Sequence, residues 1–330
     1  MSFVMKIGQL VSGSWRVSTG LTVLTILNAV VLLIAIPMSV WDQTLVAGVP
    51  AWTKPIKFSL AFLAFGPTML WIYARVKVGR IGRIALELVG WSMVLEIVLI
   101  TMQAARGVMS HFNYSTPFDG AVFRAMAAGT GIFAIAALIV GVVLARRRLE
   151  GLIGLAITLS VPIMTLGAIQ GASMTQPKPG QAEAGRLFVG GHTIGGPQVQ
   201  GPGLPFLGWS TVHGDLRVAH FVGLHVLQIL PLAALLLTVL AARGIIKTSE
   251  RRLRGAVWAG GAAYVGLILT LYFQALRGQS VIAPDVITVL MACLLVWVPV
   301  AVAFGLVLIP SRRRLRRPPG VREPIGESSP

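Results

Sequence analysis

Eight long apolar runs constrain this 330-residue chain more than any other feature. They fall at residues 20–40, 56–74, 84–103, 120–145, 151–172, 217–241, 256–275 and 286–310. About 20 apolar residues cross a bilayer as a helix, whereas a membrane barrel strand is shorter and alternates. Only 12% of the residues are charged, compared with about 25% in soluble domains. The sequence therefore predicts an all-α integral membrane bundle of about eight transmembrane helices.

The distribution of basic residues predicts the orientation of this bundle. The chain has 28 Lys and Arg against 11 Asp and Glu, a net charge of +17. Twenty of the basic residues lie on one side, in the N-terminal stretch, the connections after the second, fourth and sixth runs, and the C-terminal tail. Because such loops stay in the cytoplasm, both termini are predicted to be cytoplasmic. The basic tail is expected to face solvent and anionic membrane lipids, and no nucleic-acid partner is expected.

Four short motifs recur in the same order in the two halves of the chain. QAARG at 103–107 matches QALRG at 274–278, and RRRL at 146–149 matches RRRL at 312–315. The other matches are Asp119 with Asp285, and Lys54, Lys57 and Phe58 with Arg217, His220 and Phe221. Chance recurrence is the alternative. The shared order favours an internal duplication into two parallel four-helix repeats, residues 1–150 and 151–310, followed by a basic, disordered cytoplasmic tail at 311–330.

The outer loop at residues 173–216 breaks the symmetry of the two predicted repeats. It is rich in Gly and Pro and too poor in apolar residues to build its own core. It is therefore either a disordered connection or a lid over the outer surface. Phe206, Leu207 and Trp209 favour a packed lid.

Charged and histidine side chains gather on the predicted outer side. All five histidines lie on or near it: His111, His192, His213, His220 and His225. Around them are Lys54, Lys57, Arg106, Arg124, Arg217 and Arg277, with Asp119, Asp215 and Asp285. Such charges can simply anchor the ends of the spans. Because basic residues outside oppose the orientation rule, we instead favour binding of a small anionic or lipophilic ligand, with five candidate binding residues: Gln103, Arg106, Arg217, Gln274 and Arg277.

Glu96 lies well inside the third run. Gln103 follows it by seven residues and shares its helical face, which Arg106 continues. A carboxylate in lipid must pair or be protonated, so Glu96 is either a proton carrier or a structural partner of Arg106 or Arg124. The acid/base or catalytic candidates are therefore Glu96, His111, Asp215 and His220.

The sixth run carries two histidines. His220 and His225 are five residues apart and cannot share a metal ion on a straight helix. His225, His220 and His111 are the candidate metal or haem ligands, whereas the alternative for each is a hydrogen-bonded histidine between helices. The single cysteine, Cys293, lies in the eighth run, and the common soluble-enzyme motifs are missing from the sequence.

Three strings carry a resemblance: WTKPIKF at 52–58, QAARGVMSHFN at 103–113 and GDLRVAHFVGLHVLQILP at 214–231. They resemble an uncharacterised family of multi-pass bacterial membrane proteins, which implies a bacterial cell membrane and no particular activity. The architecture of two four-helix units with outer histidines is similar to haem A synthase. Histidines are missing from the first four runs, so at most one haem or metal site is expected here.

Three functions follow from these features. The first is a membrane oxidoreductase or oxygenase that uses haem or a non-haem metal near the outer leaflet. The second is a proton-coupled carrier or lipid-handling protein that binds an anionic ligand. The third is a non-catalytic membrane assembly subunit whose polar residues only fix the helices. The enrichment of histidine on one face places the redox function slightly first.

Overall fold

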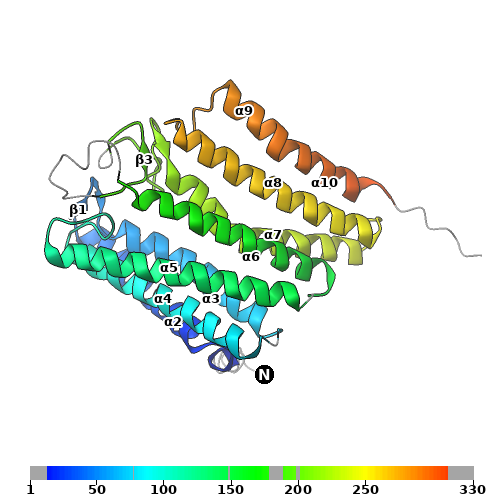
Figure 1. The fold of residues 1–330 in the computed structure, drawn as a ribbon, viewed down its shortest axis with the longest axis horizontal. Coiled ribbons are helices and arrows are strands. Elements are labelled where there is room, and N and C mark those ends of the chain that lie inside the picture. The colour runs from blue at the N-terminus through cyan, green and yellow to red at the C-terminus, as the bar shows by residue number, and fades with distance from the viewer. Residues whose placement is uncertain (1–12, 77, 148, 178–188, 198–200, 311–330) are drawn as a thin grey trace, which may run out of the picture.

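The fold is an all-α bundle with eight helices that are long and apolar enough to cross a membrane, among the residues that the structure describes (Figure 1). The computed structural model describes residues 13–76, 78–147, 149–177, 189–197 and 201–310. The first seven spans are α2 (Thr19–Trp41), α3 (Thr53–Tyr73), α4 (Gly79–Ala105), α5 (Pro117–Arg146), α6 (Gly151–Gly171), α7 (Leu216–Ala242) and α8 (Glu250–Leu276). The eighth consists of α9 (Val286–Ala292), a π-helical turn η2 (Cys293–Trp297) and α10 (Val298–Leu308). The predicted tail at 311–330 lies outside the described residues.

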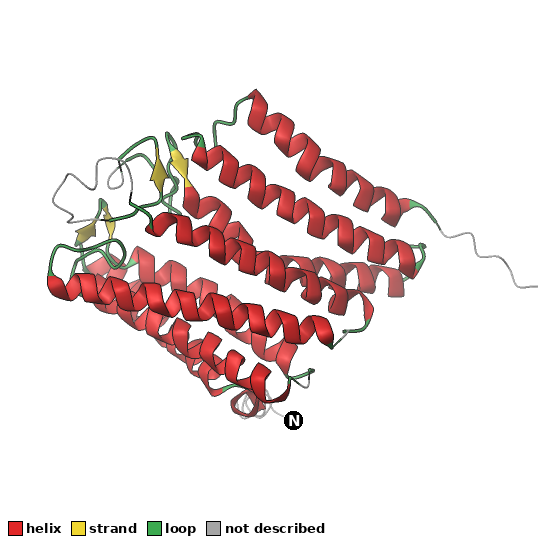
Figure 2. Ribbon diagram, in the orientation of Figure 1, coloured by secondary structure: helices red, strands yellow, loops and turns green. Residues whose placement is uncertain are grey.

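The described strands are confined to loops. Antiparallel pairs join β1 (Leu45–Val46) to β2 (Val49–Pro50) and β3 (Thr193–Ile194) to β4 (Gly214–Asp215). A 3₁₀ turn, η1 (Ala172–Thr175), extends α6. All four strands lie at the same end of the bundle (Figure 2).

Polar caps fix where several spans begin. Ser18, Thr116, Asp215, Ser249 and Asp285 each accept a hydrogen bond from a backbone N–H in the first turn of the following helix. These N–H groups have no partner inside the helix, and a side-chain oxygen at the cap satisfies one of them. The helices therefore start at polar residues just outside the apolar runs.

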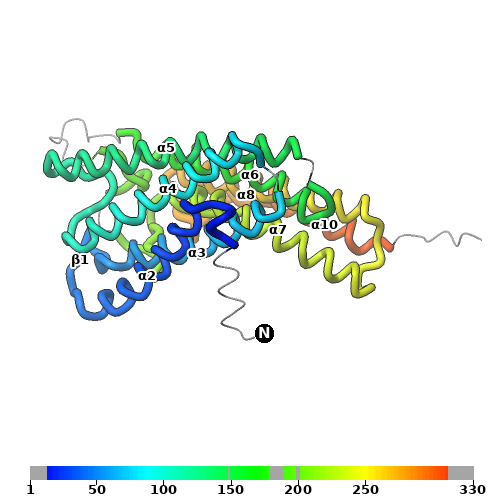
Figure 3. The backbone as a smooth tube through the Cα atoms, turned by 90° about the horizontal axis from the view of Figure 1, so that it is seen from below, coloured from blue at the N-terminus to red at the C-terminus, as the bar shows by residue number. Residues whose placement is uncertain are grey.

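The same helix pairs pack in both halves of the chain. α2 contacts α3 and α4, and α4 contacts α5; in the second half α6 contacts α7 and α8, and α8 contacts α10. The halves occupy neighbouring parts of the bundle in two perpendicular views (Figures 1 and 3). They join through α5 against α6 and α3 against α7. One buried apolar cluster runs from Leu21 on α2 to Ile268 on α8, and smaller ones form around Trp52 and around Met126.

The two ends of the bundle differ in composition. The described segments at 42–52, 106–116, 172–177, 189–197, 201–215 and 277–285 lie at one end, which we name the long-loop end. Residues 74–76, 78, 147, 149–150 and 243–249 lie at the other, the short-turn end. The described basic residues in or next to these short turns are Arg75, Arg80, Arg83, Arg146, Arg147, Arg243, Lys247, Arg251, Arg252 and Arg254.

The eighth span lies at the edge of the bundle and is almost entirely exposed. Pro299 lacks the N–H that would bind the Leu295 carbonyl, and the Val298 N–H instead reaches back to Cys293, which produces the π-helical turn. A Cβ at Gly266 of α8 would overlap the Leu295 carbonyl oxygen, so glycine there permits the two backbones to touch.

Candidate functional site

A buried carboxylate, a histidine and a lysine form a continuous polar chain at the long-loop end. Glu96 on α4 is 4% exposed, and its Oε1 atom lies 3.2 Å from His111 Nε2. His111 Nδ1 lies 2.9 Å from Lys54 Nζ at the start of α3. Ser110 Oγ lies 2.6 Å from the same ammonium. We refer to these three charged or titratable residues as the Glu96–His111–Lys54 chain.

The partners of His111 fix its tautomer. An ammonium group has only donors, so Lys54 requires His111 Nδ1 to be an acceptor. The ring proton is therefore on Nε2, where it is donated to the Glu96 carboxylate. Burial lowers the pKa of His111 and the Lys54 charge lowers it further, whereas Glu96 opposes both. An uncharged imidazole thus lies between the Lys54 side chain and the Glu96 carboxyl group.

Glu96 is incompletely satisfied. Its Oε2 atom is buried and has no hydrogen-bond partner among the described residues. The partners considered from the sequence were Arg106 and Arg124, but the structure pairs Glu96 with His111. A buried carboxylate oxygen without a donor carries a large desolvation cost, which protonation or an incoming polar group would remove.

The segment that carries His111 has an unusual backbone. The chain leaves α4 through Gly107 at φ 67° and returns through Phe112, a non-glycine residue at φ 61°. The Phe112 carbonyl accepts a hydrogen bond from the Val189 N–H at 3.1 Å, and its ring packs edge-on against Phe123. Such left-handed residues are uncommon and concentrate at functional sites.

A second polar cluster lies at the start of α7. Arg217 donates to the buried Asp215 carboxylate through Nε at 2.9 Å and Nη2 at 2.6 Å, and the Ser210 N–H adds a third donor at 2.9 Å. Burial raises the pKa of Asp215, but the hydrogen bonds and charge of Arg217 outweigh it, so the pKa stays below its usual value. His192 Nδ1 is 3.8 Å from Asp215 Oδ1, and burial followed by the Arg217 charge lowers the pKa of His192.

Residues 201–215, which we name the lid, pack onto the bundle. Lys57 Nζ on α3 donates to the Leu207 carbonyl at 3.1 Å, and Arg217 Nη2 donates to the next carbonyl, that of Gly208. The Trp209 ring lies 5.5 Å from that of Phe221 on α7, which in turn lies 4.2 Å from the His225 ring. Phe206, expected to pack, is instead 55% exposed.

The predicted ligand-binding residues of the two QAxRG motifs form helix corners. Arg106 Nη1 pairs with Asp119 at 2.6 Å, and Gln103 Nε2 donates to the same carboxylate at 2.9 Å. In the second half, Arg277 Nη1 pairs with Asp285 at 2.9 Å, and Gln274 Nε2 donates to the Ser280 carbonyl at 2.7 Å. The side chains of these four predicted residues therefore bind partners within the protein.

The predicted metal ligands do not form a ligand set. His220 Nδ1 lies 2.8 Å from the Gly167 carbonyl oxygen, and its ring fits where a Cβ at Gly171 would be. His220 lies near His111 and His225, and the latter packs beside Phe221 and Gln228. Within the described ranges, no group of three His, Cys, Asp or Glu side chains is arranged to hold a metal ion. His220 thus matches the alternative of an interhelical hydrogen-bonded histidine.

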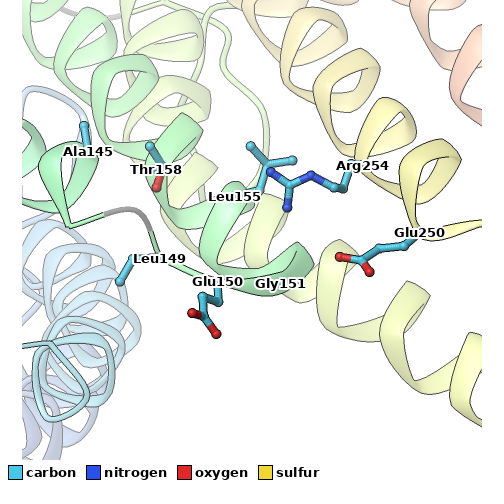
Figure 4. A pocket seen from close by; sticks show the side chains of 8 residues that line it. All are labelled: Ala145, Leu149, Glu150, Gly151, Leu155, Thr158, Glu250 and Arg254. Atoms are coloured by element: carbon cyan, nitrogen blue, oxygen red, sulfur yellow. The ribbon is translucent and has the colours of Figure 1, made fainter.

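A groove at the short-turn end is separate from these clusters. It lies between the α5–α6 turn and α8, where Glu150, Glu250 and Arg254 line it with Leu149 and Thr158 (Figure 4). None of the candidate site residues from the sequence lines this groove.

Lys54, Lys57, Ser110 and the lid carbonyls are not among the candidate site residues that the sequence suggests. Lys54 and Lys57 carried a usable signal, since both are basic residues on the side where such residues are rare. Ser110 and the carbonyls carried none. Comparison of the chain with known protein families, curated proteins and solved structures finds no match.

Proposed function

We propose that the protein is a proton-coupled membrane carrier whose proton-binding group is Glu96. The observation that carries the proposal is the Glu96–His111–Lys54 chain, which leads from the long-loop end to a buried carboxylate. The His111 side chain is 25% exposed and that of Glu96 is 5% exposed. The chain therefore runs from a hydrated group to a dry one, as a proton path requires.

The arrangement supports a simple transfer step. When His111 Nδ1 accepts a proton from the Lys54 ammonium, the Nε2 proton passes to Glu96 Oε1, which leaves a neutral amine, a neutral imidazole and a neutral carboxyl. Lys54 then takes up a proton from water at the long-loop end, so that the chain gains one proton. Loss of the Glu96 charge removes its attraction for Lys54 and frees that side chain to change partners. A carrier needs such a coupling between protonation and helix contacts, here between α4 and α3.

The redox function, first in the sequence ranking, draws less support. The three candidate metal ligands have other partners: His220 contacts the Gly167 carbonyl, His111 contacts Glu96, and His225 packs against an aromatic ring. They do not converge on one point with a third ligand among the described residues. The assembly function accounts for the helix corners at Arg106 and Arg277 but leaves the unpartnered oxygen of Glu96 unexplained. We therefore place the carrier first.

The charge distribution supports an orientation for this carrier. The short-turn end, with its arginines, would face the cytoplasm together with both termini of a bacterial cell-membrane protein. The polar chain would then take protons from the outside.

Potentiometric titration of the purified protein tests the proposal without a known substrate. A proton carrier must take up its proton near neutral pH, where ordinary carboxyl groups have already lost theirs. We therefore expect the wild type to bind more protons near neutral pH than Glu96→Gln, whereas Glu87→Gln should match the wild type there. Glu87→Gln is the matched control, because Glu87 lies on the same helix but caps α2 through the Thr19 and Gly20 N–H groups. Identical titration of the wild type and Glu96→Gln would remove the proton-binding group and the proposal with it.

A further inference from the structure

The seam between the two halves carries more positive than negative charge beneath the lid. Lys57 on α3 and Arg217 on α7 hold neighbouring lid carbonyls, and Lys54 lies close enough to both for their charges to repel. Asp215 pairs with Arg217, and Glu96 faces Lys54 through His111. The described part of the chain provides no carboxylate within salt-bridge distance of Lys57.

A half-buried ammonium bound to one neutral carbonyl is incompletely compensated. An oxyanion attracts an ammonium by a full charge, whereas a carbonyl offers only a dipole, so an oxyanion is a better partner for Lys57 than the Leu207 carbonyl. The same holds for the Arg217 Nη2 donor at Gly208. The Arg217 side chain is 30% exposed, so a solute can reach the pair from the long-loop end.

We propose that Lys57 and Arg217 form a binding site for an oxyanion, a phosphate, sulfate or carboxylate group, that takes the place of the lid carbonyls of Leu207 and Gly208. The proposal rests on the carrier function and names the class of its solute. Binding releases the two contacts that hold this part of the lid, and Trp209 moves away from Phe221.

The geometry accounts for two features that the proton path leaves unused. Lys57 makes no contact with the Glu96–His111–Lys54 chain in the described structure, yet it is a basic residue on the side where such residues are rare. The lid also presents consecutive carbonyls to cations that come from different halves of the molecule. A single oxyanion with several oxygens can bridge both cations, which one carbonyl cannot do.

Sulfate is a suitable probe because its charge stays constant near neutral pH. We expect sulfate to bind wild-type protein in phosphatidylcholine nanodiscs by calorimetry and to change the Trp209 fluorescence, with the signal assigned through Trp209→Phe. Lys57→Met should weaken binding about tenfold or more, and Lys57→Arg should retain it. Arg124→Gln is the matched control, since it removes an exposed cation of α5 near the same end.

The source of the anion is distinguished by a second set of nanodiscs. If the Trp209 fluorescence changes in phosphatidylglycerol nanodiscs, depends on Lys57 and does not respond to sulfate, the bound anion is a lipid headgroup. If the fluorescence responds to sulfate, the bound anion is a free solute. The proposed site is overturned if the wild type and Lys57→Met bind sulfate equally well and show the same Trp209 fluorescence in phosphatidylglycerol nanodiscs. Glu96→Gln separates the two proposals, because it should lose the bound proton and retain the anion response.

Discussion

The two halves of the molecule build the same helix corner, but among the described residues only the first half links a histidine of the corner segment to a buried glutamate of the preceding span. In each corner a glutamine and an arginine end one span, and the arginine pairs with the aspartate that begins the next. The spacing that separates Gln103 from Gln274 pairs Glu96 with Leu267 and His111 with Ile282. The corner is therefore a shared scaffold, and the proton-binding chain is an addition to the first half.

The lid shows the opposite asymmetry. It belongs to the second half, and its partners Lys57 and Arg217 lie near the starts of α3 and α7. They are not equivalent positions, because the recurring motif matches Arg217 with Lys54 and His220 with Lys57. Two cations from different halves of the chain thus hold neighbouring carbonyls of one segment. This comparison explains why the site lies between the halves at the long-loop end.

The largest expected effect tests the packing of the two halves. Gly90 on α4 and Gly261 on α8 are separated by the same spacing as the two corners. A Cβ at Gly90 would overlap the backbone of Gly20, whereas one at Gly261 would make ordinary contact with Leu159 at 3.5 Å. Gly90→Ala should lower the free energy of unfolding by about 3 kcal/mol, and Gly261→Ala by less than about 0.5 kcal/mol. Denaturation in detergent measures both, and equal losses would break the comparison.

A smaller effect separates the two corners. Asp119 is 2% exposed, so Arg106→Gln leaves a buried carboxylate short of a donor and should cost about 1–3 kcal/mol. The Asp285 side chain is 37% exposed and can turn to water, so Arg277→Gln should cost much less. Thermal unfolding of the two variants compares them directly. A larger loss for Arg277→Gln would reverse our view of which corner is structural.

The smallest effect concerns pH. Because the pKa of His192 is lowered in the folded protein, the unfolded chain binds a proton first as the pH falls below about 6.5. The free energy of unfolding should therefore decrease from about pH 7.5 to about pH 5.5, by about 1 kcal/mol for this histidine. Melting curves of His192→Gln should show a shallower loss than the wild type. An unchanged slope would mean that the pKa of His192 is the same in the folded and unfolded chains and would contradict this prediction.

Much of the fold could be predicted because apolar runs report helices directly. The predicted run at 217–241 matches α7 within one residue at each end. The runs at 56–74 and 84–103 began too late, because α3 starts at Thr53 and α4 at Gly79, so the helices include polar residues such as Lys54 and Arg80. Hydropathy cannot detect a helix end that is polar but still hydrogen-bonded.

The site was harder to predict because its contacts depend on loop conformation. The face shared by Glu96, Gln103 and Arg106 was visible in the sequence, but it suggested an Arg106 partner for the carboxylate. The turn through Gly107 and Phe112 instead returns His111 to α4. That conformation follows from packing against Phe123 and Val189, which no local pattern in the sequence indicates.

Infrared difference spectroscopy between neutral and acidic pH tests the central claim most directly. The account predicts a carbonyl stretch from a protonated buried carboxyl, lost in Glu96→Gln and kept in Glu87→Gln. In His111→Gln the band should appear at a different pH or more slowly, because the ring that links Glu96 to Lys54 is gone. A wild-type spectrum without this band, or a band unchanged in both Glu96→Gln and His111→Gln, would contradict the account.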